Sequence, residues 1–84
     1  MSETGMLAKS KAGHDKDKIY VIIDADPAYV YLADGKIRTV MKPKKKKRKH
    51  IQIIKKETDI QEFDDIAVRK ILREWNQTEN RKEI

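Results

Sequence analysis

The sequence contains no cysteine, only three glycines and two prolines, and few aromatic residues. Without cysteine, the chain has neither a disulfide framework nor a thiolate metal site, which fits a reducing compartment. Its apolar runs are far too short to cross a bilayer. The stretch from Met1 to Gly5 has neither the basic nor the apolar segment of a signal peptide. We therefore expect a cytoplasmic location and no membrane partner.

Side chains that carry out catalysis are also scarce. His14 and His50 are the only histidines, and no cysteine is present to join them as a metal ligand. Ser2 and Ser10 lie in no nucleophile motif, and no glycine-rich phosphate loop occurs. With 84 residues, of which 40% are charged, the chain supports one small domain with a thin core. We expect no enzyme, no cofactor, no metal and no small-molecule substrate.

Positive charge is concentrated in one segment. The net charge is +6, and Lys42 to Lys49 holds seven basic residues and no acid. The other 13 basic and 14 acidic residues nearly cancel, and residues 57–84 are acidic on balance. Because like charges repel, we expect a loop that gains order on contact with a polyanion such as a nucleic acid. A solvated loop and a nuclear localisation signal are the alternative interpretations.

Short apolar runs separated by turn residues predict strands. Val30 and Leu32 alternate with two tyrosines, and Asp34-Gly35 is a two-residue hairpin signal between two apolar runs. Four or five such strands with tight turns indicate a mainly β fold, a small barrel. The predicted strands are Met6–Ser10, Ile19–Ile23, Tyr29–Ala33, Ile37–Met41 and Ile51–Ile54.

The end of the chain changes to a helical period. Val68, Ile71, Leu72 and Trp75 fall on one face of a helix that Asp64 can cap. An earlier capping box, Thr58 with Gln61, is the competing start. The predicted organisation is an N-terminal tail (1–5), a barrel with the basic loop 42–50 (6–56), a connector (57–63), a single C-terminal α-helix (64–77) and a frayed tail (78–84).

The stretch from Lys9 to Ile23 predicts a strand, a charged hairpin tip and a second strand. Gly13 supplies a positive φ where the chain reverses, and Asp15 and Asp17 tolerate the left-handed region. The pattern S-x-A-G-H-D-K-x-K, which begins at Ser10, resembles the KOW motif of ribosomal proteins and transcription elongation factors. Asp17 departs from it, since KOW hairpins commonly have a second glycine there. The resemblance implies an SH3-like barrel.

A second block extends the resemblance. The run Tyr31 to Val40, YLADGKIRTV, is followed by K-P-K and, from Lys49, by K-H-I. Both are similar to the KOW-type large-subunit ribosomal proteins of archaea and eukaryotes (the fourteen-e family), and closer still to short bacterial KOW proteins described as RNA-binding. The resemblance covers about Gly5 to Ile54. It implies contact with structured RNA, with ribosomal RNA as the expected partner.

The predicted RNA contacts lie at the hairpin tip, at the Asp34-Gly35 turn and in the basic run. They are Lys11, His14, Lys16, Lys18, Lys36, Arg38, Lys42, Lys44, Lys45, Lys46, Lys47, Arg48, Lys49 and His50. Arg38 has an alternative role, since its side chain can pair with Asp34 across the turn. An ordinary charged turn is likewise the alternative interpretation of the hairpin tip.

Tyr29 and Tyr31 share one strand face, where they are potential stacking platforms for unpaired bases. We favour the alternative that the helix bearing Trp75 packs on this face. Two further functions stay open at this point. One is a protein-interaction KOW module that uses the tyrosine face or the acidic tail, and the other is a generic binder of DNA or other polyanions.

Overall fold

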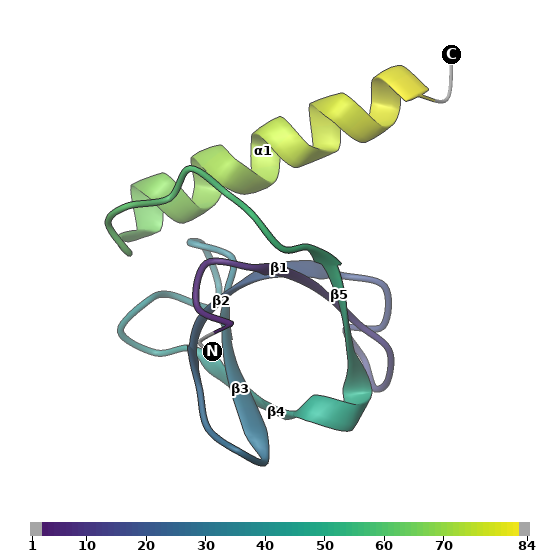
Figure 1. Ribbon diagram of the computed structural model, residues 1–84, viewed down its shortest axis with the longest axis vertical. Coiled ribbons are helices and arrows are strands. Elements are labelled where there is room, and N and C mark those ends of the chain that lie inside the picture. Colours follow the sequence, from purple (N-terminus) through teal and green to yellow (C-terminus); the bar gives the residue numbers. More distant parts are fainter. Residues whose placement is uncertain (1–2, 83–84) are drawn as a thin grey trace.

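A computed structural model describes the backbone of residues 3–82 and the side chains of residues 3–77. Its elements in chain order are β1 (Leu7–Ser10), β2 (Ile19–Ala25), β3 (Tyr29–Ala33), β4 (Lys44–Lys47), the 3-10 helix η1 (Arg48–His50), β5 (Ile51–Lys55) and α1 (Asp65–Lys82). The strands form one antiparallel sheet in the order β4-β3-β2-β1-β5. The sheet curls into a small SH3-like barrel, with η1 joining β4 to β5 and α1 lying outside (Figure 1). The predicted fold class is confirmed.

The interior of the barrel is filled by alternate residues of β1, β2 and β3. Tyr20 and Ile22 pack there with Ala8, Val30 and Leu32, and all five are buried. Side chains of successive strand residues point to opposite faces, so Ile19, Val21 and Ile23, which alternate with Tyr20 and Ile22 on β2, point outward. β2 is thus apolar on both faces, and each face is covered by a layer of apolar side chains.

Helix α1 supplies the second layer. Its buried Val68 packs with Leu7, Val21 and Ala33, which lie on the outer face of β1, β2 and β3. Ile71, Leu72 and Trp75 surround this cluster, as the helical period predicted. The prediction that the helix covers the tyrosine face is wrong, because α1 reaches Ala33 at the end of β3 and packs no further along that strand. The outward residues of β1 and β2 are more apolar than the tyrosines, and the helix packs on them.

The helix begins where the sequence predicted. The backbone N–H of Ala67 donates to Asp64 Oδ1 at 2.8 Å, which makes Asp64 the capping residue. The competing box is not used, since Thr58 Oγ1 donates to the carbonyl of Gly5 at 2.7 Å. The predicted helix end is wrong, because α1 continues to Lys82 through residues that we expected to fray. Residues 83–84 lie outside the described part of the chain.

The predicted strand Ile37–Met41 is wrong, since the chain from 34 to 43 is a loop. Asp34 holds it locally: Oδ1 of its side chain accepts from the backbone N–H groups of Lys36 and Arg38, both at 2.9 Å. The strand that pairs with β3 is instead β4, with Leu32 opposite Lys44. The basic run, which we expected to be a loop over 42–50, therefore forms the edge strand of the sheet and the 3-10 helix that follows it.

The described residues at the start of the chain are not a free tail. Glu3 pairs with Arg48, with Nη2 and Oε1 at 2.8 Å. The backbone N–H of Gly5 donates to the carbonyl of Ile22 at 2.7 Å. The prediction of a tail over 1–5 is thus wrong from Glu3 onward, and residues 1–2 lie outside the described part. These polar contacts fix the segment to the barrel.

Candidate nucleic-acid interface

The lysines of β4 alternate between two environments. Lys44 and Lys46 lie opposite the interior residues Leu32 and Val30, so they point toward the barrel interior. Lys45 and Lys47 point to the opposite side and are exposed. A run of four lysines is compatible with a strand here because β4 is at the edge of the sheet, where lysine is well tolerated. Strand alternation thus splits the basic run into inward and outward lysines.

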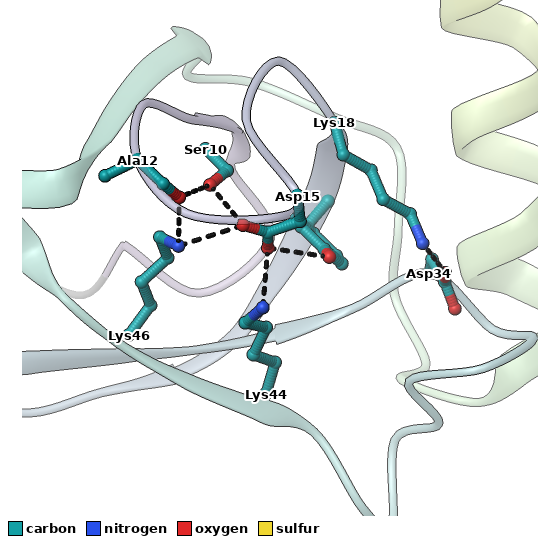
Figure 2. A network of polar contacts seen from close by, with 8 residues as sticks. Ser10, Ala12, Asp15, Lys18, Asp34, Lys44 and Lys46 are labelled. Atoms are coloured by element: carbon teal, nitrogen blue, oxygen red, sulfur yellow. Dashed lines mark hydrogen bonds and ion pairs between the residues drawn. The ribbon is translucent and has the colours of Figure 1, made fainter.

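The inward lysines share one carboxylate, that of Asp15 in the hairpin tip. Lys44 Nζ lies 2.9 Å from Asp15 Oδ2, and Lys46 Nζ lies 3.0 Å from Asp15 Oδ1. Ser10 Oγ and Tyr20 OH donate to the same carboxylate at 2.8 and 2.9 Å. We call these five residues the Asp15 cluster (Figure 2). The cluster connects the tip of the β1–β2 hairpin to the edge strand β4, two segments that are distant in sequence.

The Asp15 cluster has a consistent charge state. Burial disfavours the Asp15 carboxylate, but hydrogen bonds from Lys44, Lys46, Ser10 and Tyr20 outweigh it and hold its pKa well below the usual range. Burial and the bond to Asp15 raise the pKa of Tyr20 well above its usual value. At neutral pH the cluster therefore contains an ionised carboxylate and a neutral phenol, with the lysines as donors. Such a network stabilises the fold rather than offering two free cations to a ligand.

The outward face of β3 and β4 combines aromatic and basic side chains. Tyr29 pairs with Lys47 and Tyr31 with Lys45 across the two strands, and directly opposed residues share one face. Lys45 Nζ lies 4.2 Å from the centroid of the Tyr29 ring, a cation–π contact that leaves its charge unneutralised. We call these four residues the β3–β4 face. The helix lies over another part of the sheet, so both rings stay partly exposed.

The two tyrosines are held by the turn that precedes them. Tyr31 OH donates to Asp26 Oδ2 at 3.0 Å, and the Tyr29 backbone N–H donates to Asp26 Oδ1 at 2.7 Å. Backbone hydrogen bonds from Tyr29 and Ala28 hold the pKa of Asp26 below its usual value. Arg48 Nε donates to the carbonyl of Asp26 at 2.8 Å, so this turn is fixed on several sides. The bond to Asp26 therefore orients the ring of Tyr31, whereas Tyr29 is fixed at its backbone.

The hairpin tip adopts the predicted reversal. Gly13 has a φ of 87° and Asp17 a φ of 73°, so the aspartate does take the conformation usual for glycine. Lys11, His14 and Lys16 are exposed there. The Lys11 backbone N–H donates to the carbonyl of His50 at 2.8 Å, which brings the tip beside the residues that follow β4. The fold thus links the two predicted basic regions.

At the Asp34 turn, the predicted residues have divergent roles. Lys18 Nζ lies 2.6 Å from Asp34 Oδ2, so this lysine is neutralised within the protein. Arg38 contributes its backbone N–H to Asp34, while its side chain is exposed, as is that of Lys36. The sequence left open that the Arg38 guanidinium pairs with Asp34. In the structure, Lys18 is the residue whose side chain pairs with Asp34.

The predicted RNA contacts fall into three groups. Lys18, Lys44, Lys46 and Arg48 are each in an ion pair with a carboxylate of this chain. The side chains that are exposed are Lys11, His14, Lys16, Lys36, Arg38, Lys42, Lys45, Lys47 and Lys49. His50 is half-buried. The charge run in the sequence therefore overstates the number of cations that can reach a ligand.

Three functionally relevant residues were missed by the sequence analysis. Asp15 was interpreted only as a turn acid, although it organises the hairpin tip and β4. Arg69 and Arg73 on α1 line a cleft together with Lys36. Arg69 and Arg73 are four residues apart, so the helical period places them on neighbouring turns beside the buried face. This spacing could have identified them from the sequence. The loop that they face was not predictable, because it was expected to be a strand.

Among residues 3–77, whose side chains are described, no group of three histidine, cysteine or acidic side chains is arranged to hold a metal ion. The described backbone, residues 3–82, has no helix with the length and apolarity needed to cross a membrane. A comparison of the sequence with protein-family models finds no match, and neither does a comparison with curated proteins. The functional argument therefore depends on the geometry of the surface.

Proposed function

We propose that this chain is a non-enzymatic RNA-binding protein of the KOW type, which contacts structured RNA, with ribosomal RNA as the best candidate. The observation that carries the proposal is the β3–β4 face, where two lysines and two partly exposed tyrosines lie side by side. The resemblance of the hairpin and of the following basic block to KOW-type ribosomal proteins points in the same direction.

The chemistry of this face suits a nucleic acid. Among the described residues, Lys45 and Lys47 form no ion pair with a carboxylate, although Asp26 attracts Lys45 from a greater distance, and their position on an edge strand leaves them accessible. Phosphate contacts from such lysines release counterions and dominate affinity. Tyr29 and Tyr31 supply flat surfaces on which unpaired bases stack, a contact worth about 1–3 kcal/mol for each base. Lysines next to tyrosines match both parts of a nucleotide.

The accessible charge predicts the salt dependence. Lys44, Lys46 and Arg48 are paired within the protein, so four cations of the basic run stay available. If these neutralise roughly three to four phosphates, log K should fall against log salt with a slope of about −2 to −4. Ionic contacts to the sugar-phosphate backbone position the protein, and the shape of the RNA supplies selectivity.

The experiment compares two double variants of equal charge. Lys45→Gln/Lys47→Gln removes the outward lysines, whereas Lys55→Gln/Lys56→Gln removes two exposed lysines at and beyond the end of β5 that lies away from η1. Binding to a structured ribosomal RNA fragment is titrated at several salt concentrations. We expect the first variant to lose about tenfold in affinity and to have a slope shallower by roughly 1.5, while the control keeps most of its affinity.

Equal losses in the two variants, with equal binding to duplex DNA of the same charge, would reduce the protein to a generic polyanion binder. Absence of RNA binding at low salt would contradict the proposal altogether. Both variants change exposed residues, so circular dichroism should show the same fold and the same melting temperature for each.

A further inference from the structure

The large apolar side chains that are exposed in the described part of the chain gather in one region. They are Ile37, Met41 and Ile66, at 79%, 87% and 71% of full exposure. Ile37 and Met41 lie in the loop between β3 and β4, and Ile66 lies in the first turn of α1. A small domain needs most of its large apolar side chains for its core. Exposed apolar side chains that are concentrated at one place are therefore typical of a surface that binds another molecule.

This loop is held in place by the start of α1. The Val40 backbone N–H donates to Asp65 Oδ1 at 2.8 Å. Met41 directly follows Val40, and Ile66 directly follows Asp65, so this bond joins the two segments that carry these apolar side chains. Arg69 Nη1 donates to the carbonyl of Gly35 at 2.6 Å. The loop is therefore fixed to the helix at two points, and its apolar side chains are presented in defined positions. A surface that is ordered beforehand loses little entropy when it binds.

A cleft of about 740 Å³ opens between this loop, the helix and the β1–β2 hairpin. Ile19, Ile37 and Leu72 form the apolar part of its lining, and Lys36, Arg69 and Arg73 contribute positive charge. Two acids also line it, Asp17 and Asp34, of which Asp34 is paired with Lys18. The surface thus combines a concave apolar part with a positively charged edge.

The exposed loop has the same mixture of properties. Lys36, Arg38 and Lys42 are exposed and alternate with the apolar residues, and the loop carries no acid after Asp34. We call Lys36, Ile37, Arg38, Met41, Lys42 and Ile66 the 36–42 patch. It differs from the β3–β4 face, because it offers aliphatic side chains in place of aromatic rings.

We propose that the 36–42 patch and the adjoining cleft bind an acidic segment of a partner protein that carries aliphatic side chains. The unneutralised cations of the loop complement acidic residues of such a segment, and the concave lining accepts its apolar side chains. RNA would use the cations, but isoleucine and methionine offer no flat ring on which a base can stack.

Other occupants fit less well. In a symmetric dimer, the 36–42 patch of a second copy would place positive charge against positive charge across the contact. An anionic membrane would meet Ile37 and Met41, but a bilayer surface does not fill a cleft lined by Ile19 and Leu72. A protein segment uses both the protruding side chains and the concavity, which is why it is the preferred occupant.

The test uses the full chain and a displayed library of acidic 16-residue peptides. Peptides selected by the wild type are measured against Ile37→Ser/Met41→Ser and against the matched control Lys45→Gln/Lys47→Gln. Both serine substitutions are at exposed positions, so the fold should be retained, and the melting temperature checks this. We expect selected peptides to contain aliphatic residues, to lose about tenfold or more in affinity for the serine variant, and to keep their affinity for the control.

Two further probes distinguish the other occupants. A uridine 20-mer and phosphatidylglycerol vesicles are titrated with wild type and the serine variant. The proposal predicts that the serine substitutions leave RNA binding unchanged and that neither protein sediments with the vesicles. Failure to select any peptide, equal peptide affinity for the serine variant, or loss of RNA or vesicle binding in that variant would each overturn it. The RNA proposal is judged separately, by the lysine variants of β4.

Discussion

Replacing Asp15 with asparagine removes the one charge on which four donors converge while keeping the shape of the side chain. Ser10 donates to Oδ1 and Tyr20 to Oδ2, so the amide oxygen of asparagine can accept from one of them, while its NH2 group must donate to the other hydroxyl. The substitution thus removes the charge and changes one hydrogen bond of the Asp15 cluster. Lys44 and Lys46 lose their partner in the described structure. The side chains of Asp15 and Lys46 are each only 10% exposed, whereas that of Lys44 is 24% exposed.

The magnitude follows from this burial. Leaving a buried charge without its partner costs about 3–5 kcal/mol, and a partly exposed lysine recovers some of this by turning into water. We therefore expect Asp15→Asn to lower the free energy of unfolding by about 2–4 kcal/mol. A domain of this size has a total free energy of unfolding of roughly 4–12 kcal/mol. The melting temperature should fall by roughly 10–20 °C.

Urea denaturation followed by circular dichroism measures this loss, with Glu62→Gln as the control, since Glu62 is exposed and the charge change is the same. The double variant Asp15→Asn/Lys46→Met should recover part of the stability, because it also removes the lysine left unpaired. A loss below about 1 kcal/mol in Asp15→Asn would refute the reasoning, since it would match an exposed ion pair.

The same residue predicts how stability depends on pH. The pKa of Asp15 is lower in the folded protein than its unfolded value of about 3.9. Its contribution to stability is therefore complete above the unfolded value and is lost as pH falls from there through the folded pKa. The difference in stability between wild type and Asp15→Asn should be constant near neutral pH and should shrink below about pH 4, as urea titrations at each pH would show.

Two substitutions test how the helix is attached. Gly35→Ala should destabilise the fold by about 2–4 kcal/mol, because Gly35 has a φ of 79° and an added Cβ would lie 2.6 Å from the carbonyl oxygen of Asp65; a melting temperature equal to that of wild type would contradict this close packing. Val68→Ala should cost about 2 kcal/mol through the cavity left in the cluster with Leu7 and Val21; urea denaturation measures it, and a loss under about 0.5 kcal/mol would mean that α1 does not bury this face.

The local signals in the sequence predicted most of the fold correctly. Alternation identified Tyr29–Ala33, the apolar run identified β2, and the helical period identified the buried face of α1. These succeed because burial is set by spacing along one element. The position of Asp64 likewise predicted where the helix begins, since capping involves only neighbouring residues.

Predictions that depend on distant partners failed. Lys44 to Lys47 was interpreted as a loop because a run of like charges repels, and nothing in the sequence indicates that Asp15 pairs with both inward lysines. The apolar residues of 37–41 favoured a strand, but their backbone is held by Asp34 and by Asp65 of the helix. Each failure arises from a carboxylate far away in sequence or from a turn that competes with strand pairing.

The same distinction applies to the candidate site. Basic and aromatic residues were proposed from the sequence as RNA contacts, and strand alternation decides which of them are accessible. Lys45 and Lys47 stay available, whereas Lys44 and Lys46 do not. The tyrosine face was expected beneath the helix, and it is open because α1 packs on Leu7 and Val21 instead.

Ultraviolet crosslinking in living cells tests the central proposal most directly, since it identifies both the RNA and the residues that contact it. The crosslinked RNA is sequenced, and the modified peptides are mapped by mass spectrometry. The account predicts ribosomal RNA, with crosslinks at Tyr29, Tyr31 or the adjacent Lys45 and Lys47. Crosslinks confined to the 36–42 patch, or none above the level of unirradiated cells, would contradict it.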